Sequence, residues 1–181
     1  MLQITIPERE FYNEATGEFV YIKETVLQLE HSLISLSKWE SKWKKPFLSN
    51  KNPLTSEEML DYIRCMTINN NVPDTAYLGI GMKEMNQIRE YISDEHTATT
   101  IVDRRPRNNR SETITSELIY YWMIACQIPF ECQKWHLNRL LMLIRICNIK
   151  QGPEQKMSRQ SIYAQNKALN DARRAKLHTR G

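Results

Sequence analysis

The sequence predicts a mainly α protein of the α+β class: a helical body around a central αα-hairpin, with a small N-terminal β-hairpin or sheet and a C-terminal basic helical arm. Three observations support this prediction. Apolar residues recur at helical spacing over most of the chain, apolar alternation is confined to the start, and only 5 Gly and 7 Pro interrupt 181 residues. We expect the β element over 1–30, the helical body over 31–150 and the arm over 151–181.

The N-terminal residues 1–30 favour β-strands. Apolar and polar residues alternate over 2–6, as in a strand with one buried face, and the run 19–22 is β-branched and aromatic. Turn-forming residues at 13–17 separate these two runs, and residues 25–29 allow a third short strand. The expected product is a small antiparallel sheet or hairpin.

The helical pattern begins near Ser32. The first helix should end before Pro46, which cannot continue a helix. A second helix is predicted to start after Thr55, because Thr55 and Glu58 have the spacing of a capping box. A shorter helix is predicted over 83–92.

The central hairpin is predicted from two strongly apolar segments. A helix that opens at Thr115 or Ser116 is apolar nearly all round, so we expect it to be the central buried helix. The second segment has apolar residues at helical spacing from Trp135 onward and ends at Gly152–Pro153. The two helices would pack antiparallel to each other.

The charge is unevenly distributed. The net charge is +4, but residues 150–181 alone carry +6, which leaves −2 for residues 1–149. A second basic cluster, over 104–110, lies in a segment without apolar periodicity and is interpreted as an exposed loop. Residues 97–102, just before it, are predicted to be a short strand or an extended segment.

The sequence lacks the marks of secretion and membrane insertion. The first ten residues have neither the basic nor the long apolar stretch of a signal peptide. The longest run without charges, 118–130, has 13 residues, whereas about 20 are needed to cross a bilayer. No two of the four cysteines are spaced as CxxC, which favours reduced, buried thiols. We therefore expect an intracellular protein without a membrane span.

No catalytic or metal-binding motif is complete. Cys132 and His136 have helical i, i+4 spacing, but two further ligands for a metal ion are missing. His31 and Cys65 lack the sharp turn and the glycines of an acyl-transfer site. The glycines of 79–81 lack the remaining residues of a phosphate-binding loop. We predict no enzyme activity, no metal and no cofactor.

Candidate binding residues are aromatic or basic. Trp39 and Trp43 are predicted to anchor a client protein or a second copy, and Trp135 with Arg139 to form a second binding face. The basic residues of the arm are the other candidates: Arg159, Lys167, Arg173 and Arg174. Nucleic-acid binding is disfavoured, because the arm contains a single aromatic residue and no stacking platform.

Four stretches carry a resemblance to a known family: 29–43, 119–123, 128–141 and 173–181. Together they resemble the tail assembly chaperones, small proteins encoded in the tail-gene cluster of long-tailed bacteriophages. The resemblance implies a helical, self-associating protein of the host cytoplasm that is absent from the finished virion. Its implied partners are the tape measure protein, which it would keep soluble, and the tail tube protein.

Two other functions remain open at the level of sequence. A head-tail connector or neck protein would be a permanent part of the virion and would need large subunit interfaces. A small basic nucleic-acid-binding module would use the arm and the arginine-rich loop to contact phosphates. A chaperone should be missing from purified particles, a connector should be present in fixed copy number, and a nucleic-acid binder should shift DNA.

Overall fold

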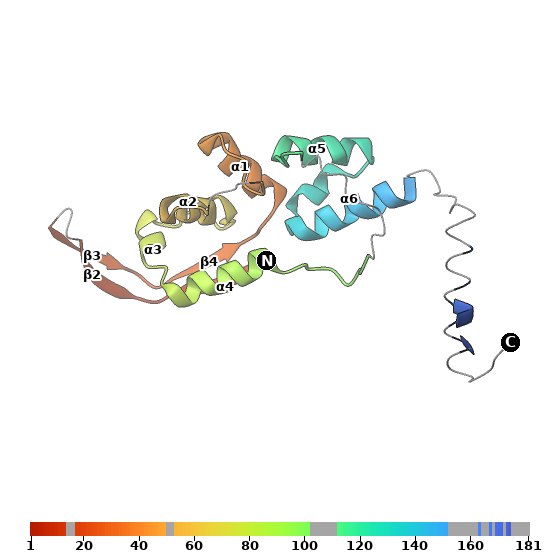
Figure 1. The fold of residues 1–181 in the computed structure, drawn as a ribbon. Helices are drawn as coiled ribbons and strands as arrows, with labels where there is room; N and C mark the ends of the chain where they lie inside the picture. The colour runs from red at the N-terminus through yellow and green to blue at the C-terminus, as the bar shows by residue number, and fades with distance from the viewer. Residues whose placement is uncertain are drawn as a thin grey trace. The chain divides into compact units, whose positions relative to one another are not determined.

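The computed structural model describes residues 1–13, 17–49, 53–101 and 112–151, and near the C-terminus 163, 167, 169–171, 173 and 174. The chain divides into two compact units, Met1–Asn148 and Ile149–Gly181. The class is mainly α (α+β), as predicted (Figure 1). The predicted arginine-rich loop over 104–110 lies outside the described residues.

The strands form two separate antiparallel pairs (Figure 1). Strand β1 (Leu2–Ile6) pairs with β4 (Thr25–Leu29), and β2 (Arg9–Asn13) pairs with β3 (Glu18–Ile22) as a hairpin. The predicted strands at 2–6, 19–22 and 25–29 are confirmed, whereas β2 was not predicted. The hairpin is inserted between the two strands of the first pair, so the N-terminal region contains both a ribbon and a hairpin.

The helices follow the strands in the chain. Their bounds are α1 Leu33–Trp43, α2 Ser56–Met66, α3 Asp74–Leu78, α4 Met82–Ser93, α5 Ser116–Ala125, η1 Phe130–Lys134 and α6 Leu137–Gln151. The predicted capping box is present, because the Thr55 hydroxyl accepts from the Glu58 amide and the Glu58 carboxylate accepts from the Thr55 amide. The short helix α3 was not predicted. Residues 97–101 form no strand.

Helix α1 contributes to two hydrophobic clusters. One side of it, with Trp39, packs in a cluster with β1, β4, α2 and α4. Its first turns, with Leu33 and Leu36, pack with Ile119 of α5 and Leu140 of α6. The predicted α5–α6 pair is therefore joined by α1 in one core, and α1 connects that core to the strands.

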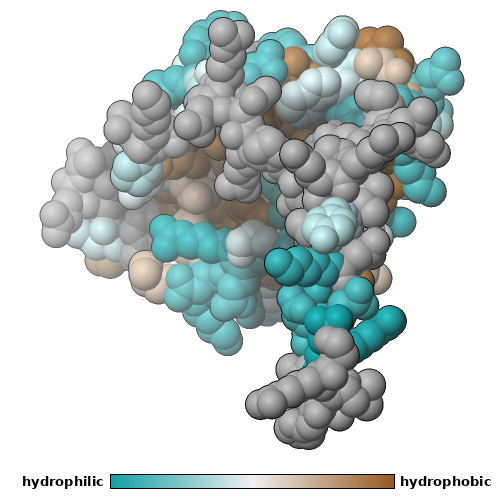
Figure 2. Space-filling model, turned by 45° about the vertical axis from the view of Figure 1, so that its right-hand side comes forward, coloured by the Kyte–Doolittle hydropathy of each residue, from teal (hydrophilic) through white to brown (hydrophobic). Residues whose placement is uncertain are grey.

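The prediction of a fully buried central helix is wrong for α5. Only Ser116, Ile119 and Met123 of α5 are buried. Tyr121 and Ile124 are 63% and 62% exposed. The composition of this helix is apolar on all sides, but α1 and α6 cover one side only. On the face shown in Figure 2, hydrophobic surface reaches the exterior between hydrophilic side chains.

A buried carboxylate joins α1 to the start of α5. Glu40 is 7% exposed, and its Oε1 accepts a hydrogen bond from the Phe47 amide at 2.8 Å. Its Oε2 accepts from the Ser116 amide at 2.7 Å, although Ser116 lies 76 residues further along the chain. One side chain thus satisfies two backbone donors that belong to different segments.

We expect Glu40→Ala to lower the free energy of unfolding by about 2–4 kcal/mol, because it leaves the Phe47 and Ser116 amides without their acceptor. Chemical denaturation followed by circular dichroism measures this loss. Glu40→Gln keeps one acceptor oxygen and should lose less, and Glu90→Ala on the exposed side of α4 is the control. An unchanged stability of Glu40→Ala would contradict this role.

Candidate protein-binding groove

Trp135 and Arg139 line a surface cavity of about 370 Å³. One wall comes from the end of η1 and from α6, and the other from the segment that follows α4. We call this cavity the Trp135 groove; it is lined by His96, Thr97, Ala98, Thr99, Trp135, Arg139, Met142, Leu143 and Ile146. On the α6 side its lining is apolar through Met142, Leu143 and Ile146, and Arg139 brings a positive charge to it.

The aromatic and cationic groups of the Trp135 groove are in direct contact. The Arg139 guanidinium carbon lies 4.4 Å from the centre of the Trp135 ring, the geometry of a cation–π pair. Trp135 is half-buried and Arg139 is exposed. Trp135 lies in the extended link between η1 and α6, and Arg139 lies in the first turn of α6, so the pair predicted from sequence is brought together in the structure.

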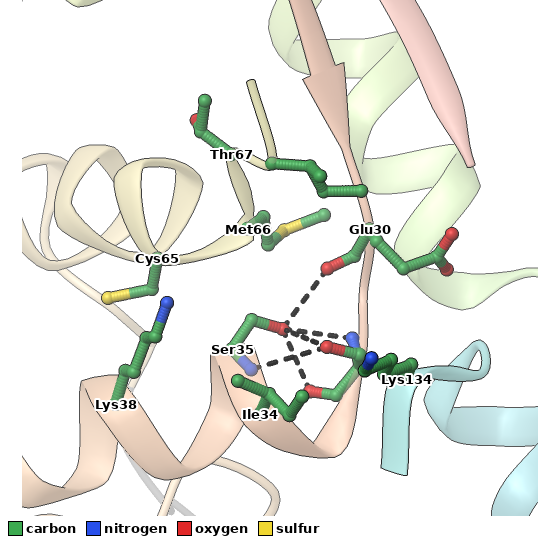
Figure 3. A pocket seen from close by; sticks show the side chains of 10 residues that line it. Glu30, Ile34, Ser35, Lys38, Cys65, Met66, Thr67 and Lys134 are labelled. Atoms are coloured by element: carbon green, nitrogen blue, oxygen red, sulfur yellow. Dashed lines mark hydrogen bonds between the residues drawn. The ribbon is translucent and has the colours of Figure 1, made fainter. Parts of the chain in front are cut away.

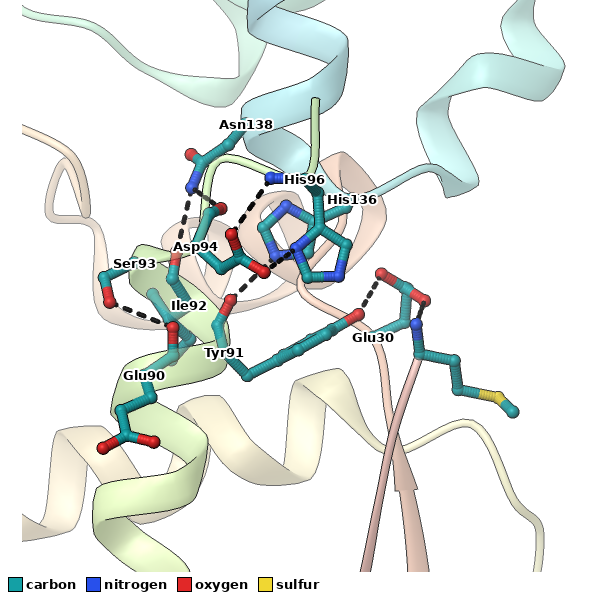
Figure 4. A network of polar contacts seen from close by, with 10 residues as sticks. Glu30, Glu90, Tyr91, Ile92, Ser93, Asp94, His96, His136 and Asn138 are labelled. Carbon is teal, nitrogen blue, oxygen red and sulfur yellow. Dashed lines mark hydrogen bonds and ion pairs between the residues drawn. The ribbon is translucent and has the colours of Figure 1, made fainter. Parts of the chain in front are cut away.

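The opposite wall is fixed to α6 by one side chain. The Asn138 amide donates to the carbonyl oxygens of Ile92 at 3.0 Å and Asp94 at 2.8 Å (Figure 4). His96 has a left-handed backbone with φ of 48°, and its Nδ1 lies 2.8 Å from a carboxylate oxygen of Asp94. The turn after α4 is therefore held against the start of α6.

His96 of this wall belongs to a cluster of three histidine rings. The rings of His96 and His136 are stacked with centroids 4.1 Å apart, and the ring of His31 is 5.1 Å from that of His136. His31 Nδ1 shares a 2.6 Å hydrogen bond with the Tyr62 hydroxyl. His136 Nε2 donates to the Tyr91 carbonyl at 3.0 Å, because a carbonyl oxygen can only accept (Figure 4).

Burial keeps the inner rings of this cluster neutral. Desolvation, together with the neighbouring His136 and His96, lowers the pKa of His31 to about 3. Burial also lowers the pKa of His136, against the opposing effect of its bond to the Tyr91 carbonyl. Within the part of the chain that the structure describes, no group of three His, Cys, Asp or Glu side chains is placed to hold a metal ion.

The same cluster is tied to the strands by Tyr91. Its hydroxyl donates to the Glu30 carboxylate at 2.7 Å, and the Met1 ammonium lies 2.9 Å from the other oxygen of that carboxylate (Figure 4). Burial and the bond to Glu30 raise the pKa of Tyr91. The network therefore links β1, the end of β4, α4 and the start of α6.

The structure corrects the interpretation of Trp39 as a surface anchor. Trp39 is fully buried, and its indole N–H donates to the Glu58 carbonyl at 2.9 Å. Trp43 is half-buried, stacks on Trp39 with centroids 6.1 Å apart, and donates to Asp61 at 2.8 Å. Both indoles thus face α2, and neither lines the Trp135 groove.

The basic candidates of the arm lie in the second unit. Lys167, Arg173 and Arg174 are exposed and helical, whereas Arg159 lies outside the described residues. Sequence reasoning missed several residues of the Trp135 groove. Met142, Leu143 and Ile146 follow Arg139 at intervals of three, four and seven, so the helical period could have identified them. No sequence pattern around His96 indicates that this segment forms the other wall of the groove.

No protein-family model matches the chain, and neither a curated protein nor a solved structure matches it. The fold class and the geometry of the Trp135 groove define the chain as an α+β protein with an aromatic, cationic groove. In the part of the chain that the structure describes, every helix is too short or too polar to cross a membrane.

Proposed function

We propose that this protein binds an amphipathic helix of a partner protein in the Trp135 groove and keeps that partner soluble, as a tail assembly chaperone does for the tape measure protein. The observation that carries the proposal is the half-buried Trp135 with the Arg139 guanidinium over its ring. Tryptophan and arginine are the residues that contribute most often to binding energy at protein interfaces.

The groove suits a helix with apolar and acidic residues on one side. Met142, Leu143 and Ile146 offer an apolar contact surface, on which the apolar face of a helix would lose its contact with water. The Arg139 guanidinium is exposed beside this surface and would pair with a carboxylate of the partner. The apolar contacts would provide affinity, and the charge would help to select the partner and its orientation.

The resemblance to tail assembly chaperones supports the identity of the partner. Tape measure proteins are long and helical, so they offer repeated amphipathic segments of the kind that the groove accepts. We accordingly propose that the protein acts in the host cytoplasm, promotes assembly of the tail tube around the tape measure protein, and is no part of the finished particle.

Co-expression with the longest helical protein encoded next to the gene tests this proposal. The wild-type protein should move that neighbour from the pellet to the supernatant and be captured with it. Arg139→Glu should reduce capture about tenfold or more, because it replaces the attracting charge by a repelling one. Trp135→Ala should have a similar effect through loss of the anchor.

The matched control is Arg89→Glu, which reverses an exposed charge on α4 away from the groove. Circular dichroism checks that each variant is folded. Equal capture by wild type and by Arg139→Glu would contradict a role for the groove. A neighbour that stays insoluble and unbound, together with a fixed copy number of the protein in purified particles, would favour the connector function instead.

A further inference from the structure

A second cavity, of about 360 Å³, lies between α1, the end of α2 and η1 (Figure 3). It is separate from the Trp135 groove and shares none of its lining residues. We call it the α1–α2 cavity; it is lined by Glu30, Ser32, Ile34, Ser35, Lys38, Cys65, Met66, Thr67, Ile68 and Lys134. Cavities of this size accept groups larger than a single side chain.

The α1–α2 cavity combines apolar walls with free positive charges. Ile34, Met66 and Ile68 line it, and Ile68 is 52% exposed. Lys38 and Lys134 are exposed, and within the described part of the chain neither ammonium has an ion pair or a hydrogen bond. A ligand of complementary chemistry would be apolar or aromatic and would carry negative charge.

The β2–β3 hairpin has this complementary chemistry. Tyr12 and Phe19 lie opposite each other with ring centroids 5.2 Å apart, and they are 54% and 69% exposed. Tyr21, two residues further along β3 and on the same face, is 50% exposed and donates to the Glu8 carboxylate. Glu10 lies opposite Tyr21, which adds a second carboxylate beside the aromatic side chains.

An isolated two-stranded hairpin with exposed aromatic side chains is marginally stable in water, so a partner that covers these side chains would stabilise it. The base of the hairpin is held by the body. There Ile22 is buried, and it approaches Gly79 so closely that a Cβ at Gly79 would lie 3.0 Å from it. The outer part of the aromatic face is available for a partner.

The hairpin and the α1–α2 cavity lie at opposite ends of the β1–β4 ribbon. Ile6 pairs with Thr25 at the end from which the hairpin extends, and Leu2 pairs with Leu29 at the end next to Glu30 of the cavity. Five paired residues span about 14 Å. In the structure the hairpin therefore extends from the end of the ribbon that is remote from its own cavity, and its aromatic face is exposed to another molecule.

We propose that the β2–β3 hairpin of one copy inserts its aromatic face into the α1–α2 cavity of a second copy. Tyr12 and Phe19 contact the apolar walls, while Glu8 and Glu10 pair with Lys38 and Lys134. The two contacting surfaces are different, so the contact is head-to-tail and each added copy leaves one hairpin and one cavity free. Such a contact produces closed rings or open chains.

Sedimentation equilibrium of the purified full chain tests this proposal without any client protein. The wild-type mass should rise with concentration, and more steeply at low salt, because charges contribute to the contact. Tyr12→Ser with Phe19→Ser, the hairpin variant, should raise the self-dissociation constant about tenfold or more. Lys38→Glu with Lys134→Glu, the cavity variant, should do the same.

Mixing the two variants is the decisive measurement. The hairpin variant keeps an intact cavity and the cavity variant keeps an intact hairpin, so an equimolar mixture should form a heterodimer and stop there. Arg89→Glu with Lys150→Glu changes the net charge equally and is the control for the cavity variant. Tyr121→Ser with Ile124→Ser on α5 is the apolar control for the hairpin variant.

Three results would overturn the proposal. A wild-type chain that stays monomeric at all concentrations has no such contact. Loss of association in the α5 control, with none in the hairpin variant, would place the interface on α5. Loss in the hairpin variant alone, without complementation by the cavity variant, would indicate pairing between two hairpins. None of these outcomes depends on client binding, so this proposal and the proposed function can fail separately.

Discussion

Replacing Trp39 by Ala is expected to lower the free energy of unfolding by about 3–5 kcal/mol. The indole is fully buried between α1 and α2, and it donates its N–H to the Glu58 carbonyl at 2.9 Å. It also makes edge contacts with Phe47 and Tyr62, whose ring centroids lie 5.2 and 6.4 Å away. The substitution would leave a cavity in the first hydrophobic cluster and remove the hydrogen bond to the Glu58 carbonyl.

Urea denaturation followed by far-ultraviolet circular dichroism measures this loss without relying on tryptophan fluorescence. Trp39→Phe keeps an aromatic ring and removes the hydrogen bond, so it should be less destabilising than Trp39→Ala. Trp43→Ala, at a half-buried position one turn further along α1, should cost less than Trp39→Ala. A loss for Trp39→Ala within about 1 kcal/mol would contradict a core role and restore the interpretation as a surface anchor.

The contrast between Trp39 and Trp43 illustrates what sequence can predict. Their i, i+4 spacing correctly predicts a helix and a shared face. Which of the two is buried depends on where α2 crosses α1, and α2 begins 13 residues after α1 ends. The boundary of α2 itself was predictable, because its capping box is formed by residues only three positions apart.

The misassigned burial of α5 has a related cause. A helix that is apolar all round is expected to be buried, but its composition does not say how many neighbours the fold provides. In the structure Ile119 and Met123 face α1 and α6, while Tyr121 and Ile124 face outward. The strand β2 was missed because Arg9–Asn13 has no strong alternation and depends on pairing with β3.

Only one of the two walls of the Trp135 groove could be predicted from the sequence. Trp135 and Arg139 are only four positions apart in the chain, so a local pattern identifies them. The opposite wall lies about 40 residues earlier in the chain, and Asn138 holds it through bonds to backbone carbonyls, which carry no sequence signal. The histidine cluster is formed by His31, His96 and His136 from three distant segments, so only the folded chain reveals it.

Acidification is expected to destabilise the protein through this histidine cluster. His31 has a pKa of about 3 in the folded chain and an ordinary value of 6.5, so the unfolded chain binds a proton that the folded chain excludes. The stabilising contribution is complete above pH 6.5 and is lost progressively between pH 6.5 and about 3. At about 1.4 kcal/mol per pH unit the loss reaches up to about 5 kcal/mol. The lowered pKa of His136 acts in the same direction.

Denaturation midpoints of wild type and His31→Gln at a series of pH values test this expectation. Glutamine stays uncharged at every pH and can still bond to the Tyr62 hydroxyl, so the stability of the variant should be much less sensitive to acid. At pH 7 the variant should be less stable than wild type. The carboxylates near the cluster, Glu30 and Asp94, are present in both proteins, so comparing the two slopes cancels their contribution. Parallel pH profiles would mean that His31 accepts its proton without unfolding and that the neutral ring is not required. A flattened profile would show that exclusion of a proton from the buried ring couples the fold around the Trp135 groove to pH.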